Sequence, residues 1–183
     1  TTDEEKTPNV YYFLNFNYTN LLYRYYDEIG GMAKDINYIH GCLGNYLGCN
    51  QEPVFGFGDE VDERYHEFEK QDNNAVFEHI KSFKYLESRN YRNLMEFVNS
   101  NPFQICIYGH SCGISDRTML KNIFEHDNCI SIKQYYHKRE DGSDDYTLKN
   151  YAISKHFSNK STLRDKVVNL EYCTPMVQPD KGD

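Results

Sequence analysis

Runs of apolar residues alternate along the chain with segments of helical periodicity. Residues 10–16, VYYFLNF, are almost all apolar or aromatic, which predicts a strand covered on both faces. The polar residues NYTN follow, and residues 21–29 then predict a helix capped by an Asn or Thr at the strand's end. Residues 35–41, DINYIHG, alternate as a second strand, and residues 52–60 predict a brief third one. The first part of the chain therefore predicts strands joined by a helix.

The rest of the chain repeats this alternation, beginning with a helical pattern over about residues 60–100. Residues 103–109, FQICIYG, are the clearest buried strand that the sequence predicts, and residues 129–138 alternate as another. Residues 146–157 predict a helix and residues 166–173 a last strand. Apolar residues recur at helical spacing in four groups: Val61, Tyr65 and Phe68; Val76, Ile80 and Phe83; Met119, Leu120, Ile123 and Phe124; and Leu148, Tyr151, Ala152 and Ile153.

Strands that alternate with helices predict an α/β fold with a mainly parallel sheet flanked by helices. We expect a single domain over residues 1–183, or the C-terminal part of one, with a helical insertion at about residues 60–100. Ligands of such sheets bind at the carboxyl ends of the strands. Three predicted strand ends carry polar residues: Asn17-Tyr18-Thr19, His40-Gly41 and Gly109-His110-Ser111. The sequence therefore predicts that these three turns converge on one ligand.

Composition indicates which class of partner and which cellular compartment to expect. The chain has 28 acidic and 20 basic side chains and a net charge of -8, so a nucleic-acid partner is not expected. No apolar stretch is long enough to span a membrane, and the first residues do not resemble a signal peptide, so we expect a cytoplasmic protein. The six cysteines form no CxxC pair, which predicts reduced and mostly buried thiols.

The turn after the strand at residues 103–109 is the first candidate site. Gly109 and Gly113 allow a tight turn, Ser111 can donate a hydrogen bond, and Asp116 or Ser115 is a natural cap for the next helix. Backbone N–H groups at such a helix start attract an anion or a sugar hydroxyl. The alternative is a capped turn that binds nothing.

The same residues, GHSCG, also match the nucleophile elbow G-x-S-x-G. In that alternative Ser111 is the nucleophile of a serine hydrolase, and a later acid and His156 complete the triad. The strand-turn-helix context fits this pattern. The chain after Ser111, however, leaves room for few further strands.

His40 is the second candidate, because histidine is the natural general base at neutral pH. It lies at a strand end beside a glycine, and we expect its ring to be exposed enough to titrate. One alternative is an ordinary, partly buried histidine. Another is a metal site that joins His40 to Cys42 and Cys49, with Cys173 or His66 as a further ligand.

Asn17 is the third candidate, because its side-chain amide can both donate and accept hydrogen bonds. A primary amide or a ribose would suit such a group. Alternatively, Asn17 and Thr19 only cap the helix that follows them.

The ordered set FNYT, IHG, FGFGDE and IYGHSCGISD, from about Phe13 to Phe124, resembles the AbiH family of bacteriophage abortive infection proteins. The pattern is also similar to sirtuin-like domains of bacterial antiphage defence, which bind NAD. By this resemblance Asn17 orients nicotinamide and ribose, and His40 is the general base. The remaining residues of the implied NAD site are Thr19, Gly41, Gly109, His110, Ser111 and Asp116.

The resemblance implies a sirtuin-like or Rossmann-like three-layer domain that cleaves the N-glycosidic bond of NAD and so halts phage replication. It implies NAD as substrate or ligand, no metal, and a phage protein as trigger; a homo-oligomer is left open. The glycine-rich stretch that begins the family pattern does not precede Val10, so a domain without its first strand–helix unit is left open as an alternative. The alternative is a non-catalytic module that binds a nucleotide or a phage protein.

Overall fold

The chain forms two compact units, each with its own pair of parallel strands. The structure is a computed structural model that describes residues 8–25, 33–44, 49, 51–56, 65–70 and 74–178. Unit 1 comprises Thr1–Phe55 and Phe83–Phe97, and unit 2 comprises Gly56–Ser82 and Val98–Asp183. The single domain expected over the whole chain stays a prediction.

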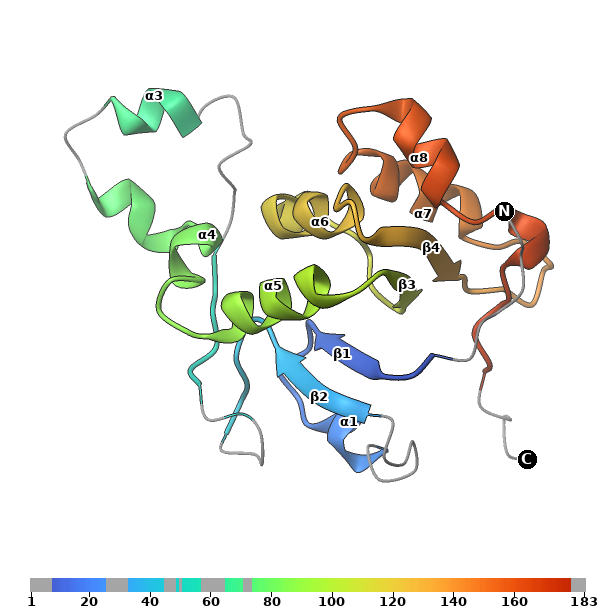
Figure 1. The fold of residues 1–183 in the computed structure, drawn as a ribbon, viewed down its shortest axis with the longest axis horizontal. Coiled ribbons are helices and arrows are strands. Elements are labelled where there is room, and N and C mark those ends of the chain that lie inside the picture. The colour runs from blue at the N-terminus through green and yellow to red at the C-terminus, as the bar shows by residue number, and fades with distance from the viewer. Residues whose placement is uncertain are drawn as a thin grey trace. The chain divides into compact units, whose positions relative to one another are not determined.

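Unit 1 is built on strands β1 (Tyr11–Asn15) and β2 (Ala33–Tyr38), with helix α1 (Leu21–Arg24) between them in sequence (Figure 1). Most of α5 (Asn90–Ser100) also belongs to this unit. The two strands pair in parallel, with Asn15 opposite Tyr38 at their carboxyl ends. Both predicted strands are confirmed. The expectation that β1 is covered on both faces is wrong, because its side chains are mostly half-buried and β2 is its only partner strand among the described residues.

Two amide side chains, of buried Asn37 and half-buried Asn90, connect β2 to the start of α5. Asn37 Nδ2 donates to Tyr12 Oη at 2.6 Å and to the Asn90 carbonyl at 2.7 Å. Asn90 Nδ2 in turn donates to the Tyr38 carbonyl at 2.6 Å. The rings of Tyr12 and Phe97 stack with their centroids 4.4 Å apart. A displacement of α5 would leave these polar groups buried without hydrogen-bond partners, which is unfavourable. The network therefore fixes α5 against the strand pair.

A disulfide joins Cys42 to Cys49, so the expectation of reduced thiols is wrong for this pair. After β2 the chain turns back, and Cys42 N donates to the carbonyl of Gln51 at 3.2 Å, which brings the two cysteines together. Sequence spacing carries no signal for this turn. The cysteines at 106, 112, 129 and 173 are free; the first is exposed and the others are buried.

Reduction of this disulfide should lower the free energy of unfolding by about 2 to 3 kcal/mol, because the bond removes entropy from the unfolded chain by closing a short loop. Urea unfolding with and without a reductant measures the loss. A Cys42→Ser/Cys49→Ser double variant should start at the lower stability and not respond to the reductant. An unchanged urea midpoint for the wild type in reductant would contradict the expectation.

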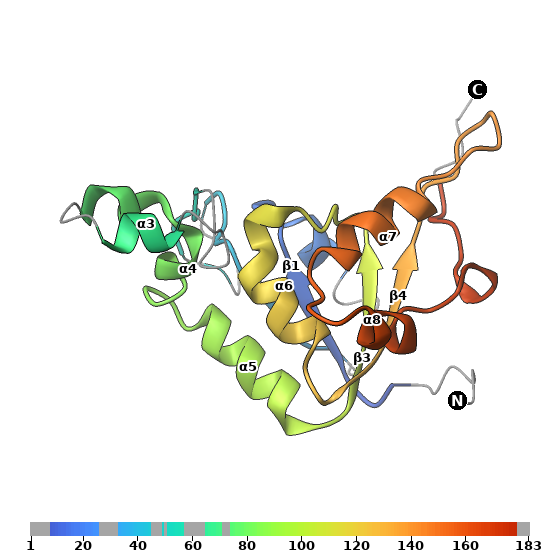
Figure 2. The same ribbon diagram turned by 90° about the horizontal axis from the view of Figure 1, so that it is seen from above.

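Unit 2 is centred on the parallel strands β3 (Phe103–Tyr108) and β4 (Cys129–Tyr135), which lie side by side in Figure 2. The helices α6, α7 and α8 contact β4. The elements of this unit besides the strands are α3 (Tyr65–Glu69), η2 (Asn74–His79), the start of α4 (Lys81–Lys84), η3 (Ile114–Asp116), α6 (Arg117–Phe124), α7 (Tyr146–Ser154), α8 (Lys160–Lys166) and η4 (Leu170–Tyr172).

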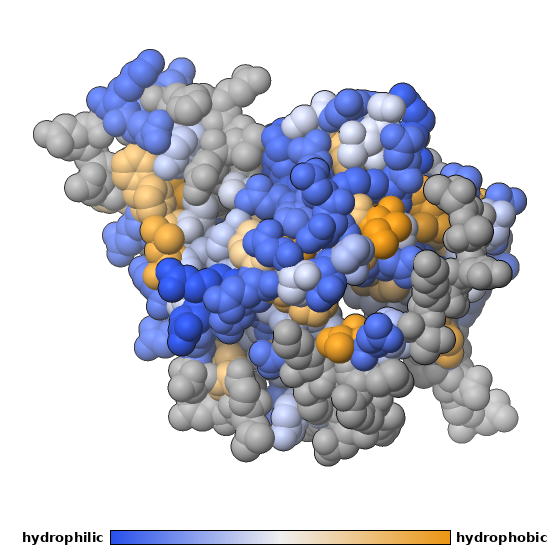
Figure 3. All heavy atoms as spheres, in the orientation of Figure 1, coloured by the Kyte–Doolittle hydropathy of each residue, from blue (hydrophilic) through white to orange (hydrophobic). Residues whose placement is uncertain are grey.

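Helix α6 carries the apolar face that the sequence predicts. Its four predicted core residues, Met119, Leu120, Ile123 and Phe124, are all buried, together with Ile132 of β4 and Ile153 of α7. Hydrophilic side chains predominate where α6 lies on the face shown in Figure 3. This burial fixes α6 on the sheet, and with α6 the turn that precedes it.

Two predicted core segments are more exposed than expected. In β3 only Ile107 is buried, whereas Cys106 and Tyr108 are exposed, so the prediction of a buried strand is wrong for one face. In α7, Ile153 is buried but Leu148 and Tyr151 are exposed. A two-stranded sheet covers fewer side chains than the larger sheet that the pattern predicted.

Two predicted strands do not appear among the described residues. Residues 51–56 have no regular secondary structure, and residues 57–60 lie outside the described part. The last predicted strand, at residues 166–173, is replaced by the end of α8, by η4 and by a single bridge between Val167 and Ile132. Residues 160–166 instead form a helix whose cap, Asn159 Oδ1, accepts from Ser161 N at 2.7 Å.

The α/β class and the parallel pairing of strands are confirmed. The described strands form two two-stranded sheets, and the sirtuin-like three-layer arrangement stays a prediction. Among the described residues, no helix has both the length and the apolar character needed to cross a membrane.

Candidate functional site

The carboxyl ends of β1 and β2 bring two of the predicted turns together in unit 1. Ile39 N donates to the Asn15 carbonyl at 3.2 Å, and Leu43 N donates to the Tyr18 carbonyl at 2.8 Å. The turn that holds Asn17 and the turn that holds His40 are therefore joined by backbone hydrogen bonds. Parallel pairing explains this, because it places both carboxyl ends at one edge of the sheet.

His40 lies at this edge but is only 4% exposed, so the expectation of an exposed ring is wrong. Its ring contacts Phe16 edge-on, with centroids 5.5 Å apart, and lies parallel to the ring of Tyr85 at 6.4 Å. Its backbone carbonyl accepts from Val54 N at 2.7 Å. Aromatic packing and the backbone thus fix the imidazole.

The metal alternative at His40 does not fit this structure. It requires the sulfur atoms of Cys42 and Cys49 as thiolate ligands. These two atoms are bonded to each other in the disulfide. The chain between Cys42 and Cys49 is thus held by a disulfide and not by a metal ion.

Gly41 is glycine for two independent reasons. Its φ is +73°, in the left-handed region that residues with a Cβ rarely adopt. A Cβ built at this position would overlap the backbone carbonyl of Glu52. The residue is buried, so the close approach of the two backbone segments explains the glycine whether or not a ligand binds there.

Asn17 and Thr19 are exposed at the same edge, and the helix-cap alternative does not describe them. The N-cap of α1 is Asn20, whose side chain makes no capping hydrogen bond. The turn is formed by Asn15, whose Oδ1 accepts from Asn17 N at 2.9 Å. The Asn17 amide and the Thr19 hydroxyl are therefore accessible to a ligand.

The turn after β3 is held in an uncommon conformation by two histidines of unit 2. Cys112 has a φ of 52°, and it is the only described non-glycine residue with a positive φ. Its N–H donates to His110 Nδ1 at 3.1 Å, and its carbonyl accepts from His156 Nε2 at 2.9 Å. Backbone strain of this kind persists only where the surroundings over-determine it, and it occurs often at functional sites.

Asp116 has a different role from the predicted helix cap. It occupies the N-cap position of α6, but its side chain makes no capping hydrogen bond. Instead its Oδ1 lies 3.1 Å from Lys81 Nζ, and its Oδ2 lies 3.7 Å from His110 Nε2. The carboxylate is thus shared between a lysine from α4 and a histidine of the turn.

The geometry does not favour a serine hydrolase. In a nucleophile elbow the serine itself occupies the strained position, whereas here that position is Cys112 and not Ser111. A carbonyl can only accept, so His156 Nε2 carries a hydrogen and cannot take the Ser111 proton in this arrangement. Cys112 is no better as a nucleophile, because burial raises the pKa of its thiol to about 11.

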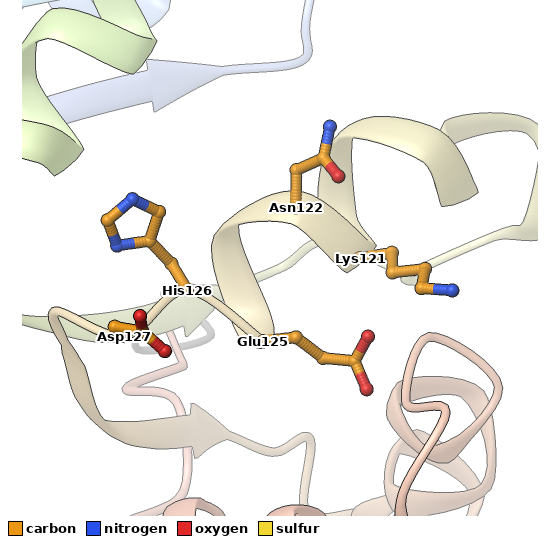
Figure 4. Close-up of a pocket in the computed structure, with 5 residues that line it drawn as sticks. All are labelled: Lys121, Asn122, Glu125, His126 and Asp127. Atoms are coloured by element: carbon orange, nitrogen blue, oxygen red, sulfur yellow. The ribbon is translucent and has the colours of Figure 1, made fainter.

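A hollow of about 330 Å³ lies at the other end of α6, and its residues have structural roles (Figure 4). It is lined by Lys121, Asn122, Glu125, His126 and Asp127. The Glu125 carboxylate accepts from Ser158 N at 2.6 Å, and His126 Nε2 lies 3.1 Å from Asn99 Oδ1. In Figure 4 the side chains point in several directions and do not converge. We therefore do not assign a ligand to it.

The structure thus groups the predicted site residues in two sets. Asn17, Thr19, His40 and Gly41 lie at the edge of β1 and β2, and Gly109, His110, Ser111 and Asp116 lie at the end of β3. Convergence of the two sets on one ligand stays a prediction. Sequence reasoning missed Lys81, because a pair separated by 35 residues leaves no local pattern, and it missed the link between His156 and Cys112 for the same reason.

Comparison with known proteins identifies the family of the chain. No curated protein and no solved structure is significantly similar to the chain. Residues 2–138 match the family described as bacteriophage abortive infection AbiH, and this segment includes both sets of predicted site residues. The match covers more than half of the chain. The chain therefore belongs to the AbiH family of bacteriophage abortive infection proteins.

Proposed function

We propose that this abortive infection protein binds NAD at the carboxyl edge of its parallel strands and cleaves the N-glycosidic bond of NAD. The observation that carries the proposal is the backbone pairing that joins the Asn17 turn to the His40 turn at one strand edge. The inference does not depend on the sirtuin-like three-layer arrangement, because parallel strands of any such sheet place their ligand-binding turns at that edge.

Exposed groups at this edge suit a nicotinamide nucleoside. Asn17 offers an amide that can pair with the carboxamide, and Thr19 offers a hydroxyl. Phe55 is exposed, and its ring lies 5.3 Å from that of Tyr18, so an aromatic surface for the base adjoins the Asn17 turn. Together these groups recognise an aromatic amide attached to a sugar.

In the proposed reaction, the bond between ribose C1′ and the nicotinamide nitrogen breaks, and its electron pair leaves with nicotinamide. Positive charge develops on the ribose, and a water oxygen bonds to C1′. His40 takes the proton that the water loses, so NAD and water become ADP-ribose and nicotinamide. A site that excludes bulk water strengthens the polar contacts to the charged ribose.

The turn after β3 would contact the ribose and the phosphates. Gly109 has a φ of +72° with nothing within 4 Å of a Cβ position, so a ligand can approach its backbone closely. Ser111 is exposed and can donate to a phosphate oxygen. His110 and Asp116 would shape the turn, as their contacts with Cys112 and Lys81 indicate.

The burial of His40 favours a second candidate, a module that binds NAD without cleaving it and signals to a partner. A ring that is 4% exposed cannot reach a water or a ribose hydroxyl unless the neighbouring side chains move. In this alternative the protein with NAD bound would signal by self-assembly or by binding a phage protein.

One experiment separates the two candidates. The purified chain is incubated with NAD, with and without lysate from phage-infected cells, and nicotinamide and ADP-ribose are measured by chromatography. Calorimetry measures NAD binding in parallel. Products support the glycohydrolase, and binding without products supports the sensor. If NAD neither binds nor is cleaved under any condition, both candidates are overturned.

A further inference from the structure

We propose that Lys81 is a positioning residue of the turn after β3, acting through Asp116 on His110. The inference rests on the proposed function, in which that turn contacts the nucleotide. Lys81 lies in the helical segment before α5, 35 residues before Asp116, and no local pattern in the sequence points to it.

The ion pair of Lys81 with Asp116 is buried. Nζ and Oδ1 are 3.1 Å apart, and the two side chains are only 12% and 9% exposed. By contrast, Lys84 of the same helix pairs with Glu87 at 2.8 Å, with side chains 32% and 65% exposed. An exposed pair constrains little, whereas removal of one partner from a buried pair leaves an uncompensated charge. Lys81 therefore fixes the Asp116 carboxylate strongly.

The fixed carboxylate presents its second oxygen to His110. Oδ2 lies 3.7 Å from His110 Nε2, and Ser115 Oγ lies 3.4 Å from the same oxygen. Asp116 gives no side-chain hydrogen bond to the helix that it begins. Its carboxylate therefore serves the contacts with Lys81 and His110 and not the helix start.

His110 transmits this orientation to the backbone of the turn. Because Cys112 N–H donates to Nδ1 at 3.1 Å, that nitrogen carries no proton, and the hydrogen of the neutral ring is on Nε2, which faces Asp116. The chain of contacts runs from Lys81 through Asp116 and His110 to Cys112, whose φ is 52°. Loss of the cation would remove one constraint on the carboxylate, and so loosen the His110 ring and the strained backbone at Cys112, between Ser111 and Gly113.

Four variants of the full chain test this inference. Lys81→Met removes the cation, Lys81→Arg keeps it, and Lys84→Met is the matched control on the same helix. The charge-swapped variant Lys81→Asp/Asp116→Lys restores an ion pair but places a cation opposite His110. For each we measure NAD affinity by calorimetry, hydrogen exchange of the Cys112 amide without NAD, the His110 tautomer by nitrogen NMR, and the melting temperature.

We expect Lys81→Met to weaken NAD binding about tenfold and to accelerate exchange of the Cys112 amide. Lys81→Arg and Lys84→Met should remain within about twofold of the wild type in affinity. The charge-swapped variant should regain melting temperature but not affinity, amide protection or the His110 tautomer, because the lysine opposite His110 cannot accept the hydrogen of Nε2. If the ion pair were purely structural, the swap would restore all four properties.

Two results would overturn the inference: an unchanged Cys112 amide and His110 tautomer in Lys81→Met, or full recovery of both in the charge-swapped variant. These two readouts need no ligand. If the wild type binds no NAD, the proposed function fails, and the amide and tautomer still decide whether Lys81 positions the turn. The two failures are thus distinguishable.

Discussion

Replacement of His40 by alanine should lower NAD cleavage by a factor of about 10² to 10⁴, the range typical for loss of a general base. The proton released by the attacking water then has no positioned acceptor. NAD affinity should change much less than the rate, because the proposed amide and hydroxyl contacts come from Asn17 and Thr19. Product formation by chromatography and NAD affinity by calorimetry measure the two effects separately.

The burial of His40 calls for two controls. Its ring packs against Phe16 and Tyr85, so the alanine variant also loses packing, and its melting temperature must be measured. His40→Gln keeps more of the side-chain volume without a titratable ring and should be as inactive as the alanine variant. His137→Ala removes a histidine that pairs with Gln178 and should retain activity. Equal cleavage by wild type and a folded His40→Ala variant would refute the role of the base.

Replacement of Gly41 by alanine should lower the free energy of unfolding by about 3 kcal/mol or more, because a left-handed alanine and an overpacked contact each cost about 1 to 3 kcal/mol. The methyl group would collide with the backbone of Glu52, and backbone cannot move aside as a flexible side chain can. Because Gly41 follows His40 directly, the displacement would also shift the imidazole. Urea unfolding of the variant measures the loss.

Gly109→Ala is the matched control for this prediction. Its φ of +72° is nearly the same as the +73° of Gly41, but nothing lies within 4 Å of its Cβ position. Only the conformational term applies, so the loss should be about 1 kcal/mol. Equal losses for the two variants would show that the approach of Glu52 does not determine the glycine at position 41.

Local patterns predicted the elements whose apolar residues all face one way. The four apolar residues of α6 are buried as their spacing indicates, β1 and β3 lie in the predicted apolar runs, and β2 and β4 lie in the predicted alternating segments. The pattern failed where burial depends on the size of the sheet. Tyr108 and Leu148 are apolar and exposed, because the strand pair does not cover them.

The sequence indicated which candidate residues lie at strand ends and what their side chains can do, but it did not indicate their contacts. The turns that hold Asn17 and His40 are joined because two strands pair in parallel, which the alternation of elements indicates. The disulfide of Cys42 and Cys49 depends on a local turn, and the pairing of Lys81 with Asp116 depends on how the chain folds back over 35 residues. Such contacts have no periodicity and no motif, so the sequence could not reveal them.

Binding of NAD by the Asn17 turn and the His40 turn, at the carboxyl edge of β1 and β2, is tested most directly by hydrogen exchange with and without NAD. Saturating NAD should slow exchange in peptides that cover residues 15–19 and 39–42 of unit 1 and residues 109–113 of unit 2. Residues 121–127, around the polar hollow, should not respond. Unchanged exchange at residues 15–19 and 39–42 in saturating NAD would contradict the proposed site.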